Sequence, residues 1–142
     1  MPVRTGAQYI AALRDNQPEV YLNGERVKDV TPHPALTNGV QTLARLYDMQ
    51  HDPKIADQMT YTSPTTGDQV GLSFILPKTP EDLQRRHTMM ANWARVSCGM
   101  MGRSPDFMNV NIMAMAAAGD YFAQNRPEFK NNIQNYYEYV RE

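Results

Sequence analysis

The chain has 142 residues and a mass of 16.2 kDa, which is the size of one ordinary domain. Its 14 Lys and Arg residues against 15 Asp and Glu residues give a net charge of −1, so no strong field attracts nucleic acid or an anionic membrane surface. The single cysteine, Cys98, excludes an intrachain disulfide framework and a cysteine-built zinc site. No apolar run approaches the roughly 18 residues that span a bilayer, and the N-terminus has no apolar signal core. We therefore expect a soluble, cytoplasmic protein with no nucleic acid and no membrane among its partners.

The first thirty residues predict a helix and a hairpin. Apolar residues at helical spacing follow Thr5, a residue type that caps helices, and predict a helix over residues 5–16. Asn23-Gly24 separates two short segments with strand character, and this dipeptide is the strongest short-range hairpin signal because both turn residues take positive φ. The sequence therefore predicts a small β-hairpin over residues 19–27.

The middle of the chain alternates between helical and irregular signals. Two prolines among residues 31–34 predict an extended linker, because proline holds the backbone out of the helical region. An apolar stripe predicts a helix over residues 38–50, and a shorter helix over 53–59 follows it. Residues 60–71 are rich in turn-forming types and predict a loop with a short strand on each side. Apolar residues alternate over 70–76, which predicts a brief strand or extended segment.

The second half of the chain has clear helix boundaries. Thr79 can cap a helix that has Pro80 in its first position, and Gly102 stands where a left-handed C-terminal residue is expected. Ser104 starts the next helix by the same logic, and Gly119 marks its break. The expected helices cover residues 79–101, 105–118 and 127–141. The fold class predicted from these patterns is mainly α, with a small β-hairpin.

Methionines and aromatic residues predict an apolar face on the 105–118 and 127–141 helices. Ten methionines are many for this length, and methionine fills cores or adaptable contact surfaces. We expect this face to be exposed or used for self-association in the isolated chain. The last helix reaches Glu142 without a stop signal, so we expect the chain to be the front of a longer polypeptide.

The turn around Arg103 is the candidate site that the residues themselves indicate. One helix ends and another begins within a few residues, and the backbone N–H groups after Ser104 lack partners inside the helix. A guanidinium beside free N–H groups suits a developing negative charge, such as a phenolate, carboxylate or flavin oxygen. The alternative is that Arg103 only satisfies carbonyls at the first helix's end and pairs with Asp106.

Other polar groupings carry weaker signals. The three histidines, His33, His51 and His87, are too dispersed to suggest a metal site, so no metal is expected. We interpret the arginines at 85, 86 and 95 as a solvated helix face, and the tyrosines at 136, 137 and 139 as core or interface residues.

Several segments, in order, resemble one enzyme family. These are Arg-Thr-Gly-Ala-Gln-Tyr at 4–9, Val-Tyr-Leu-Asn-Gly-Glu-Arg-Val at 20–27, Asp-Val-Thr-Pro-His-Pro at 29–34 and Gly-Arg-Ser-Pro-Asp-Phe at 102–107. The sequence is similar to the oxygenase component of 4-hydroxyphenylacetate 3-monooxygenases, whose N-terminal motif reads Gly-Arg-Thr/Ser-Pro-Asp-Tyr/Phe. The resemblance covers essentially the whole chain.

The resemblance implies the oxygenase half of a two-component flavin monooxygenase. In that family a separate flavin reductase supplies reduced FAD, and the oxygenase uses it with dioxygen to hydroxylate a phenol ortho to its hydroxyl group. The implied fold resembles acyl-CoA dehydrogenases, with a helical N-terminal domain, a β-barrel middle domain and a C-terminal helical bundle. Residues 1–142 then form the single N-terminal domain, with the other two domains absent from this chain. The intact protein is expected to be a homo-oligomer, a tetramer or dimer.

The resemblance also implies roles for single residues. Arg103 would polarise the phenol oxygen, and Ser104, Pro105, Asp106 and Phe107 would lie along the same wall of the substrate pocket. Phe107 stands where many family members have tyrosine, and it cannot form a hydrogen bond with a substrate hydroxyl. Most FAD contacts would lie beyond residue 142, so the fragment alone is expected to bind FAD weakly and to be inactive.

Two other interpretations concern the same sequence. The 4-hydroxybutyryl-CoA dehydratases share the implied fold but need a Cys-x-x-x-Cys pair for an iron–sulfur cluster; Gly102 stands four residues after Cys98, so the chain cannot supply that pair. A non-catalytic helical assembly module is the remaining alternative. A β-barrel and a helical bundle encoded after residue 142 would favour the enzyme over the module.

Overall fold

Helices dominate the architecture, as the sequence predicts. The computed structural model describes residues 3–142, and it describes the backbone of Arg103 without its side chain. The α-helices are α1 (Gly6–Asn16), α2 (Thr37–Asp48), α3 (Ala56–Met59), α4 (Pro80–Ser97), α5 (Pro105–Ala117), α6 (Gly119–Ala123) and α7 (Glu128–Arg141). Three 3-10 turns intervene: η1 (Met49–His51), η2 (Leu72–Phe74) and η3 (Met101–Arg103). The strands form two antiparallel hairpins, β1 (Val20–Leu22) with β2 (Glu25–Val27) and β3 (Thr60–Thr62) with β4 (Gln69–Gly71).

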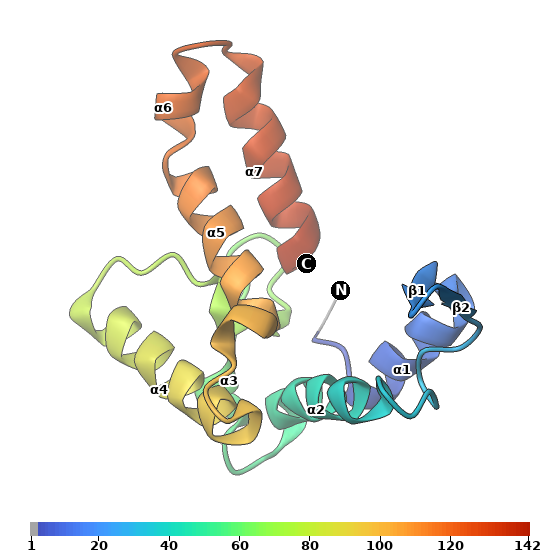
Figure 1. Cartoon of the computed structure of the whole chain (residues 1–142). Coiled ribbons are helices and arrows are strands. Elements are labelled where there is room, and N and C mark those ends of the chain that lie inside the picture. The colour runs from blue at the N-terminus through green and yellow to red at the C-terminus, as the bar shows by residue number, and fades with distance from the viewer. Residues whose placement is uncertain (1–2) are drawn as a thin grey trace.

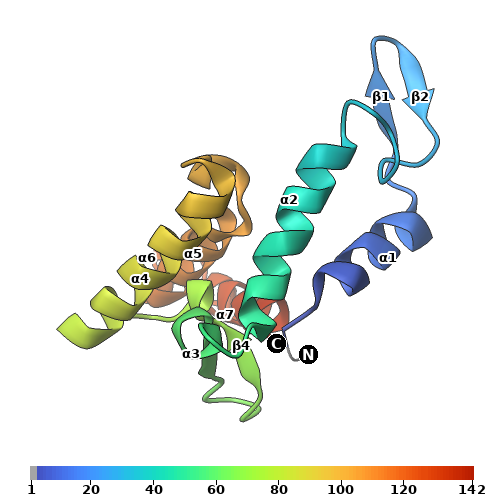
Figure 2. The same ribbon diagram turned by 90° about the horizontal axis from the view of Figure 1, so that it is seen from below.

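The elements form two groups joined by α4 and the second hairpin. In Figure 1, α5, α6 and α7 build a column of helices, while α1, α2 and the first hairpin extend as an arm on the other side. Figure 2 shows α1 and α2 lying along one another within that arm. Both ends of the described chain reach the second hairpin: the Val3 N–H donates to the Gln69 carbonyl at 3.2 Å, and Glu142 accepts from Ser63 Oγ at 2.6 Å.

The predicted N-terminal helix and hairpin are both confirmed. Thr5 and Gln8 form a reciprocal capping box at the start of α1. Gly6 allows α1 to approach α2, because a Cβ there would lie 2.5 Å from the Ala44 carbonyl oxygen. In the β1–β2 turn, Asn23 and Gly24 have φ values of 52° and 85°, as the hairpin signal requires.

The linker over residues 31–34 is not extended as predicted. It forms consecutive turns, in which the His33 carbonyl accepts from the N–H groups of Leu36 and Thr37 at 2.9 and 2.8 Å. The physical reason is that proline also favours the first inner position of a turn, and Pro34 follows His33 there.

The predicted segment between the second hairpin and α4 needs one correction. The loop with a strand on each side is confirmed by β3 and β4. The alternation over 70–76, however, gives a strand only as far as Gly71, and residues Leu72–Phe74 turn into η2. Side chains from other helices satisfy the carbonyls of this turn, so no ladder is needed: Arg86 donates to Ser73 and Tyr137 donates to Phe74.

Helix α4 starts where predicted and ends earlier than predicted. Thr79 and Asp82 form a capping box. The helix stops at Ser97 because Cys98 and Gly99 take left-handed conformations with φ of 52° and 80°, so the predicted stop at Gly102 is wrong. The Ala94 carbonyl accepts from the N–H groups of both left-handed residues, which closes the helix end.

The C-terminal column agrees with the predicted helices and adds one. The break after α5 falls at Ala118, next to the predicted Gly119, and the last helix lies within the predicted 127–141. The sequence patterns do not predict the short helix α6. Ser104 occupies the N-cap position of α5, but its Oγ donates to the Met101 carbonyl at 2.8 Å and does not cap α5.

The main core joins α2, α3, η2 and α4. Its buried members are Leu46, Met59, Leu72, Ile75, Met89 and Trp93. The Trp93 indole N–H donates to the Leu46 carbonyl at 3.2 Å, so the ring is fixed in orientation as well as in place. On α4 the buried face therefore follows Met89 and Trp93, whereas Leu83 and His87 of the predicted stripe are exposed.

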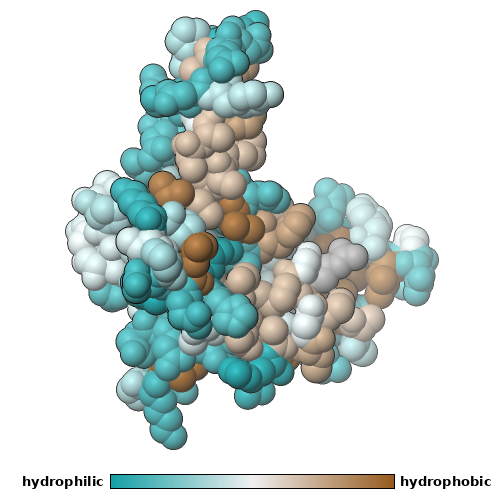
Figure 3. All heavy atoms as spheres, turned by 90° about the vertical axis from the view of Figure 1, so that its left-hand side faces the viewer, coloured by the Kyte–Doolittle hydropathy of each residue, from teal (hydrophilic) through white to brown (hydrophobic). Residues whose placement is uncertain are grey.

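An apolar surface remains exposed on the column, as predicted. The large apolar side chains exposed on α5 and α7 are Phe107, Met108, Met115, Tyr136 and Tyr139. Figure 3 shows apolar surface running up the column of helices. Apolar side chains lie on more than one side of α5, with Met113 buried and Phe107, Met108 and Met115 exposed, so packing one side of it against α7 leaves another side in solvent.

Candidate functional site

The backbone between α4 and α5 makes a tight reversal that presents the start of α5. Cys98 and Gly99 end α4 in left-handed conformations, η3 follows, and Ser104 and Pro105 begin α5. Proline suits the first helical position because its missing N–H would have no partner inside the helix. The candidate motif 102–107 therefore spans the end of η3 and the first turn of α5.

The predicted site residues differ widely in their surroundings. Ser104 and Asp106 are buried, Pro105 lines a cavity, and Phe107 exposes 52% of its surface. The Arg103 side chain lies outside the described part of the structure, so both the chemical role predicted for it and its alternative pairing with Asp106 stay predictions. The structure thus gives Phe107 and Pro105 open surroundings and encloses Ser104 and Asp106.

A buried ion pair stands behind this first turn of α5. Arg86 Nη2 donates to Asp106 Oδ1 at 2.7 Å, and Arg86 Nη1 donates to the Ser73 carbonyl at 2.6 Å. The two residues are only 7% and 5% exposed, respectively. Burial raises the pKa of the Asp106 carboxyl, and the Arg86 guanidinium opposes part of that rise.

The position of Arg86 corrects the interpretation of the arginines at 85, 86 and 95 as one solvated face. Arg86 belongs to the inward face of α4, three residues before Met89 and seven before Trp93. That i, i+3, i+7 spacing is the signal that sequence reasoning could have used, because those positions share one face of a helix. Arg95 is exposed, in agreement with the prediction.

Two further hydrogen bonds extend the buried polar cluster. Asn109 Nδ2 donates to Ser73 Oγ at 2.7 Å, one helical turn after Asp106. The Tyr137 hydroxyl of α7 donates to the Phe74 carbonyl at 2.6 Å. Of the three tyrosines near the C-terminus, Tyr137 is therefore a core residue, while those at 136 and 139 are exposed. Helices α4, α5 and α7 all bond to the same turn, η2.

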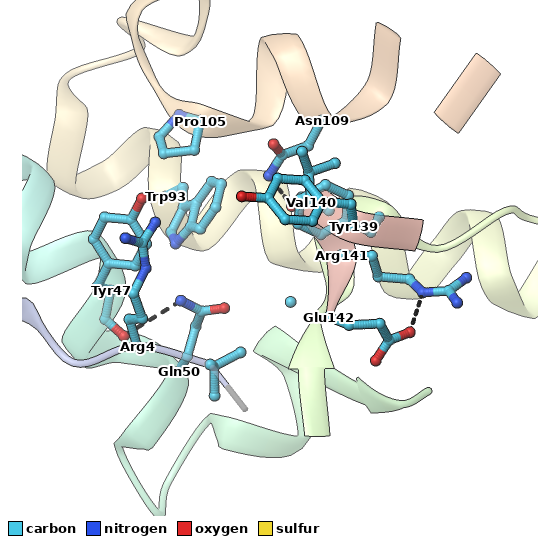
Figure 4. Close-up of a pocket in the computed structure, with 14 residues that line it drawn as sticks. Arg4, Tyr47, Gln50, Trp93, Pro105, Asn109, Tyr139, Val140, Arg141 and Glu142 are labelled. Atoms are coloured by element: carbon cyan, nitrogen blue, oxygen red, sulfur yellow. Dashed lines mark hydrogen bonds and ion pairs between the residues drawn. The ribbon is translucent and has the colours of Figure 1, made fainter. Parts of the chain in front are cut away.

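A cavity of about 380 Å³ lies between the arm and the column. Figure 4 shows Trp93, Pro105 and Asn109 on one side of it and Arg4, Tyr47 and Gln50 on another. The Arg4 guanidinium lies 5.5 Å from the centre of the Tyr47 ring. Aromatic rings, amides and a cation make this cavity suitable for a polar aromatic group, and sequence reasoning missed it because its walls come from distant segments.

The described residues hold no group of three or more metal-ligating side chains. Among them, no helix has both the length and the apolar character that crossing a membrane requires.

The arrangement of helices identifies the chain as a mainly helical domain of the acyl-CoA-dehydrogenase-like fold. An oxygen-tolerant archaeal 4-hydroxybutyryl-CoA dehydratase from N. maritimus shares the fold over 98% of this chain and 27% of its own, with a TM-score of 0.81 at 20% identity. The model of the family described as 4-hydroxyphenylacetate 3-hydroxylase N terminal matches residues 5–142, so the chain belongs to that family.

Relatives within the family are similar along the whole chain. The 4-hydroxyphenylacetate 3-monooxygenase oxygenase component of Geobacillus sp. is 49% identical over 142 residues, which is all of this chain and 28% of the relative. A crystal structure of such an oxygenase component complexed with FAD and 4-hydroxyphenylacetate is 48% identical and has a TM-score of 0.88, over 97% of this chain and 28% of that chain. The chain thus spans just over a quarter of the length of these relatives.

Proposed function

We propose that this chain is the N-terminal domain of the oxygenase component of a two-component, FADH2-dependent monooxygenase. The whole enzyme would hydroxylate a phenol such as 4-hydroxyphenylacetate at the carbon next to its hydroxyl group. The observation that carries the proposal is the family match over residues 5–142, together with 49% identity to an oxygenase component. The relative of known structure is complexed with both FAD and 4-hydroxyphenylacetate.

The start of α5 fits a phenol. Ser104 does not cap this helix with its side chain, so the first N–H groups of α5 are available to an oxygen that carries negative charge. Phe107 offers a half-exposed aromatic ring within the same turn. An aromatic ligand that carries a phenolic oxygen matches both features.

In this proposal the residues of the chain bind and orient the substrate. Reduced FAD, when bound, supplies the electrons that activate dioxygen. Arg103 and the free N–H groups of α5 hold the phenol oxygen and stabilise the negative charge that develops on it, which makes the ortho carbon electron-rich. Phe107 packs against the phenol ring and excludes water. Without a hydroxyl it places no hydrogen bond on the substrate, in contrast to the tyrosine common in similar sequences.

The proposal includes partners and location. A separate flavin reductase would deliver the reduced FAD, and the intact oxygenase would be a homo-oligomer with the middle β-barrel and C-terminal bundle following residue 142. A cytoplasmic location is supported by the exposed free thiol of Cys98, which suits a reducing compartment. The exposed apolar side chains of the column also favour contact with further protein, which would be the other domains of the same enzyme.

The full-length oxygenase should form a catechol from 4-hydroxyphenylacetate when it is supplied with a flavin reductase, NADH, FAD and air. Chromatography of the product tests this directly, with the reductase alone as the control. Oxidation of the reduced flavin without any catechol, for 4-hydroxyphenylacetate and for a panel of para-substituted phenols, would contradict the proposal and favour the assembly module.

A further inference from the structure

We propose that the buried ion pair between Arg86 and Asp106 positions the start of α5, and that Asp106 acts through Arg86 without contacting the substrate. This inference rests on the proposed function, since the group being positioned is the substrate-facing turn with Arg103 and Phe107. It assigns Asp106 a different role from the other residues of the 102–107 motif.

Burial is the first reason. Both side chains are more than nine-tenths enclosed, and Asp106 Oδ1 accepts from Arg86 Nη2 at 2.7 Å. If Asp106 turned to a ligand, it would leave the Arg86 guanidinium as a buried charge without its carboxylate, which is strongly unfavourable. Asp106 is therefore committed to Arg86.

The second reason is the geometry of α5. Asp106 and Asn109 are three residues apart, so they lie on the same face of the helix. Both are bonded to the interior, Asp106 to Arg86 and Asn109 to Ser73. Two anchors one turn apart fix the rotation of α5 about its own axis. Phe107 follows Asp106 by one residue, about 100° further round the helix, and this fixed rotation leaves it exposed.

The third reason is the number of segments that Arg86 joins. Its two terminal nitrogens reach the Ser73 carbonyl in η2 and the carboxylate in α5, while its own backbone belongs to α4. A buried ion pair seldom stabilises a fold more than well-packed apolar residues of the same size would, but it does specify one arrangement of the groups around it. This pair specifies the distance and direction of α5 relative to α4.

The test is a double-mutant cycle in the full-length oxygenase with its reductase. The variants are Arg86→Gln, Asp106→Asn and the two combined, and the measured quantity is catechol formed per flavin oxidised. We expect each single variant to lower this coupling about tenfold, because a displacement of about 1 Å at a reacting centre costs up to about a hundredfold. The double variant should be no worse than the poorer single variant, because both changes break the same link.

An additive double variant would show that Asp106 contacts the substrate itself, and single variants with wild-type coupling would show that the pair positions nothing; either result overturns the inference. Asp120→Asn is the matched control, because it breaks the exposed ion pair between Asp120 and Lys130 on the same column, and its coupling should equal that of the wild type.

A second variant separates positioning from stability. Arg86→Met combined with Asp106→Leu removes both charges, so the thermal midpoint should fall only by what the lost hydrogen bond from Arg86 to the Ser73 carbonyl costs. We expect its coupling to remain about tenfold low, since the bonds that orient α5 are gone. Wild-type coupling in this variant would mean that the pair only stabilises the fold. A wild-type enzyme that forms no catechol would instead refute the proposed function.

Discussion

Asp106 and Phe107 are neighbours in the sequence, yet their side chains have opposite surroundings. Asp106 is 5% exposed and its carboxylate is bonded to Arg86, while Phe107 is 52% exposed. The sequence motif alone predicts that Asp106 and Phe107 lie along the same wall of one pocket. In the helix, however, consecutive residues project about 100° apart. Phe107 therefore lies on the outward side of this turn, where a ligand can reach it.

Arg103→Ala in the full-length oxygenase should lower the rate of phenol hydroxylation about 10²–10³-fold, because a fixed donor to a developing negative charge is lost. Arg103→Lys should recover only part of the rate, since an ammonium group lacks the planar fork of a guanidinium. Catechol formed per unit time measures the effect. Arg95→Ala, which removes an exposed arginine of α4, is the matched control. A near wild-type rate for Arg103→Ala would mean that Arg103 only completes a helix end.

At the scale of elements, α4 shows how differently the two ends of a helix can be specified. Its start has a reciprocal cap, in which Thr79 Oγ1 accepts from the Asp82 N–H at 3.2 Å and Asp82 Oδ2 accepts from the N–H groups of Lys78 and Thr79. Its end depends on Cys98 in a left-handed conformation that a cysteine rarely adopts. The position of η3, and with it the candidate motif, follows from that early end.

Thr79→Ala should lower the free energy of unfolding by about 1 kcal/mol, the usual cost of losing an N-cap.

The same cap should be sensitive to acid. Hydrogen bonds, first from the Lys78 N–H, hold the pKa of Asp82 below its ordinary value of 3.8. The cap's contribution is thus complete above pH 3.8 and lost as the pH falls through the lower folded-state pKa. Circular dichroism melts of wild type and Asp82→Asn should converge in acid; a constant difference down to pH 2 would contradict this prediction.

Local chemistry explains which elements could be predicted from the sequence. The caps at Thr5 and Thr79 and the Asn23-Gly24 turn are decided by a few adjacent residues, so their signals are visible in the chain itself. The end of α4 also has a local signal, because Gly99 takes the positive φ of 80° that suits glycine. The turn η2, by contrast, is decided by tertiary packing. Leu72 and Ser73 are enclosed between α4 and α5, and side chains remote in sequence satisfy this turn. No local sequence pattern predicts hydrogen bonds from side chains so distant in the sequence.

The candidate site likewise has one part that the sequence predicts and one part that only the folded structure shows. The motif 102–107 stands out in the sequence as a turn with free N–H groups, and its placement at the start of α5 follows from Pro105. The ion pair of Arg86 with Asp106 joins residues twenty positions apart, and the cavity joins both ends of the chain. Both require the folded arrangement, because the partners meet only after α4 and α5 pack together.

For the whole molecule, the exposed apolar side of the column has a measurable consequence. The 142-residue chain alone should self-associate at high concentration and bind a dye for apolar surface, because an apolar patch of this kind is unfavourable in water. Sedimentation measures the association, and Met115→Gln with Tyr139→Gln should weaken it, since both side chains are exposed on the column. A clean monomer at every concentration, without dye binding, would contradict this expectation.

We propose that this chain belongs to an enzyme that transfers one oxygen atom from dioxygen to a phenol. Isotope labelling tests it most directly: the full-length oxygenase, its reductase, FAD and 4-hydroxyphenylacetate are allowed to react under ¹⁸O₂, and the product is analysed by mass spectrometry. We expect a catechol that carries one ¹⁸O atom, in the new hydroxyl group next to the original one. A product without ¹⁸O, or complete oxidation of the reduced flavin with no hydroxylated product, would contradict it.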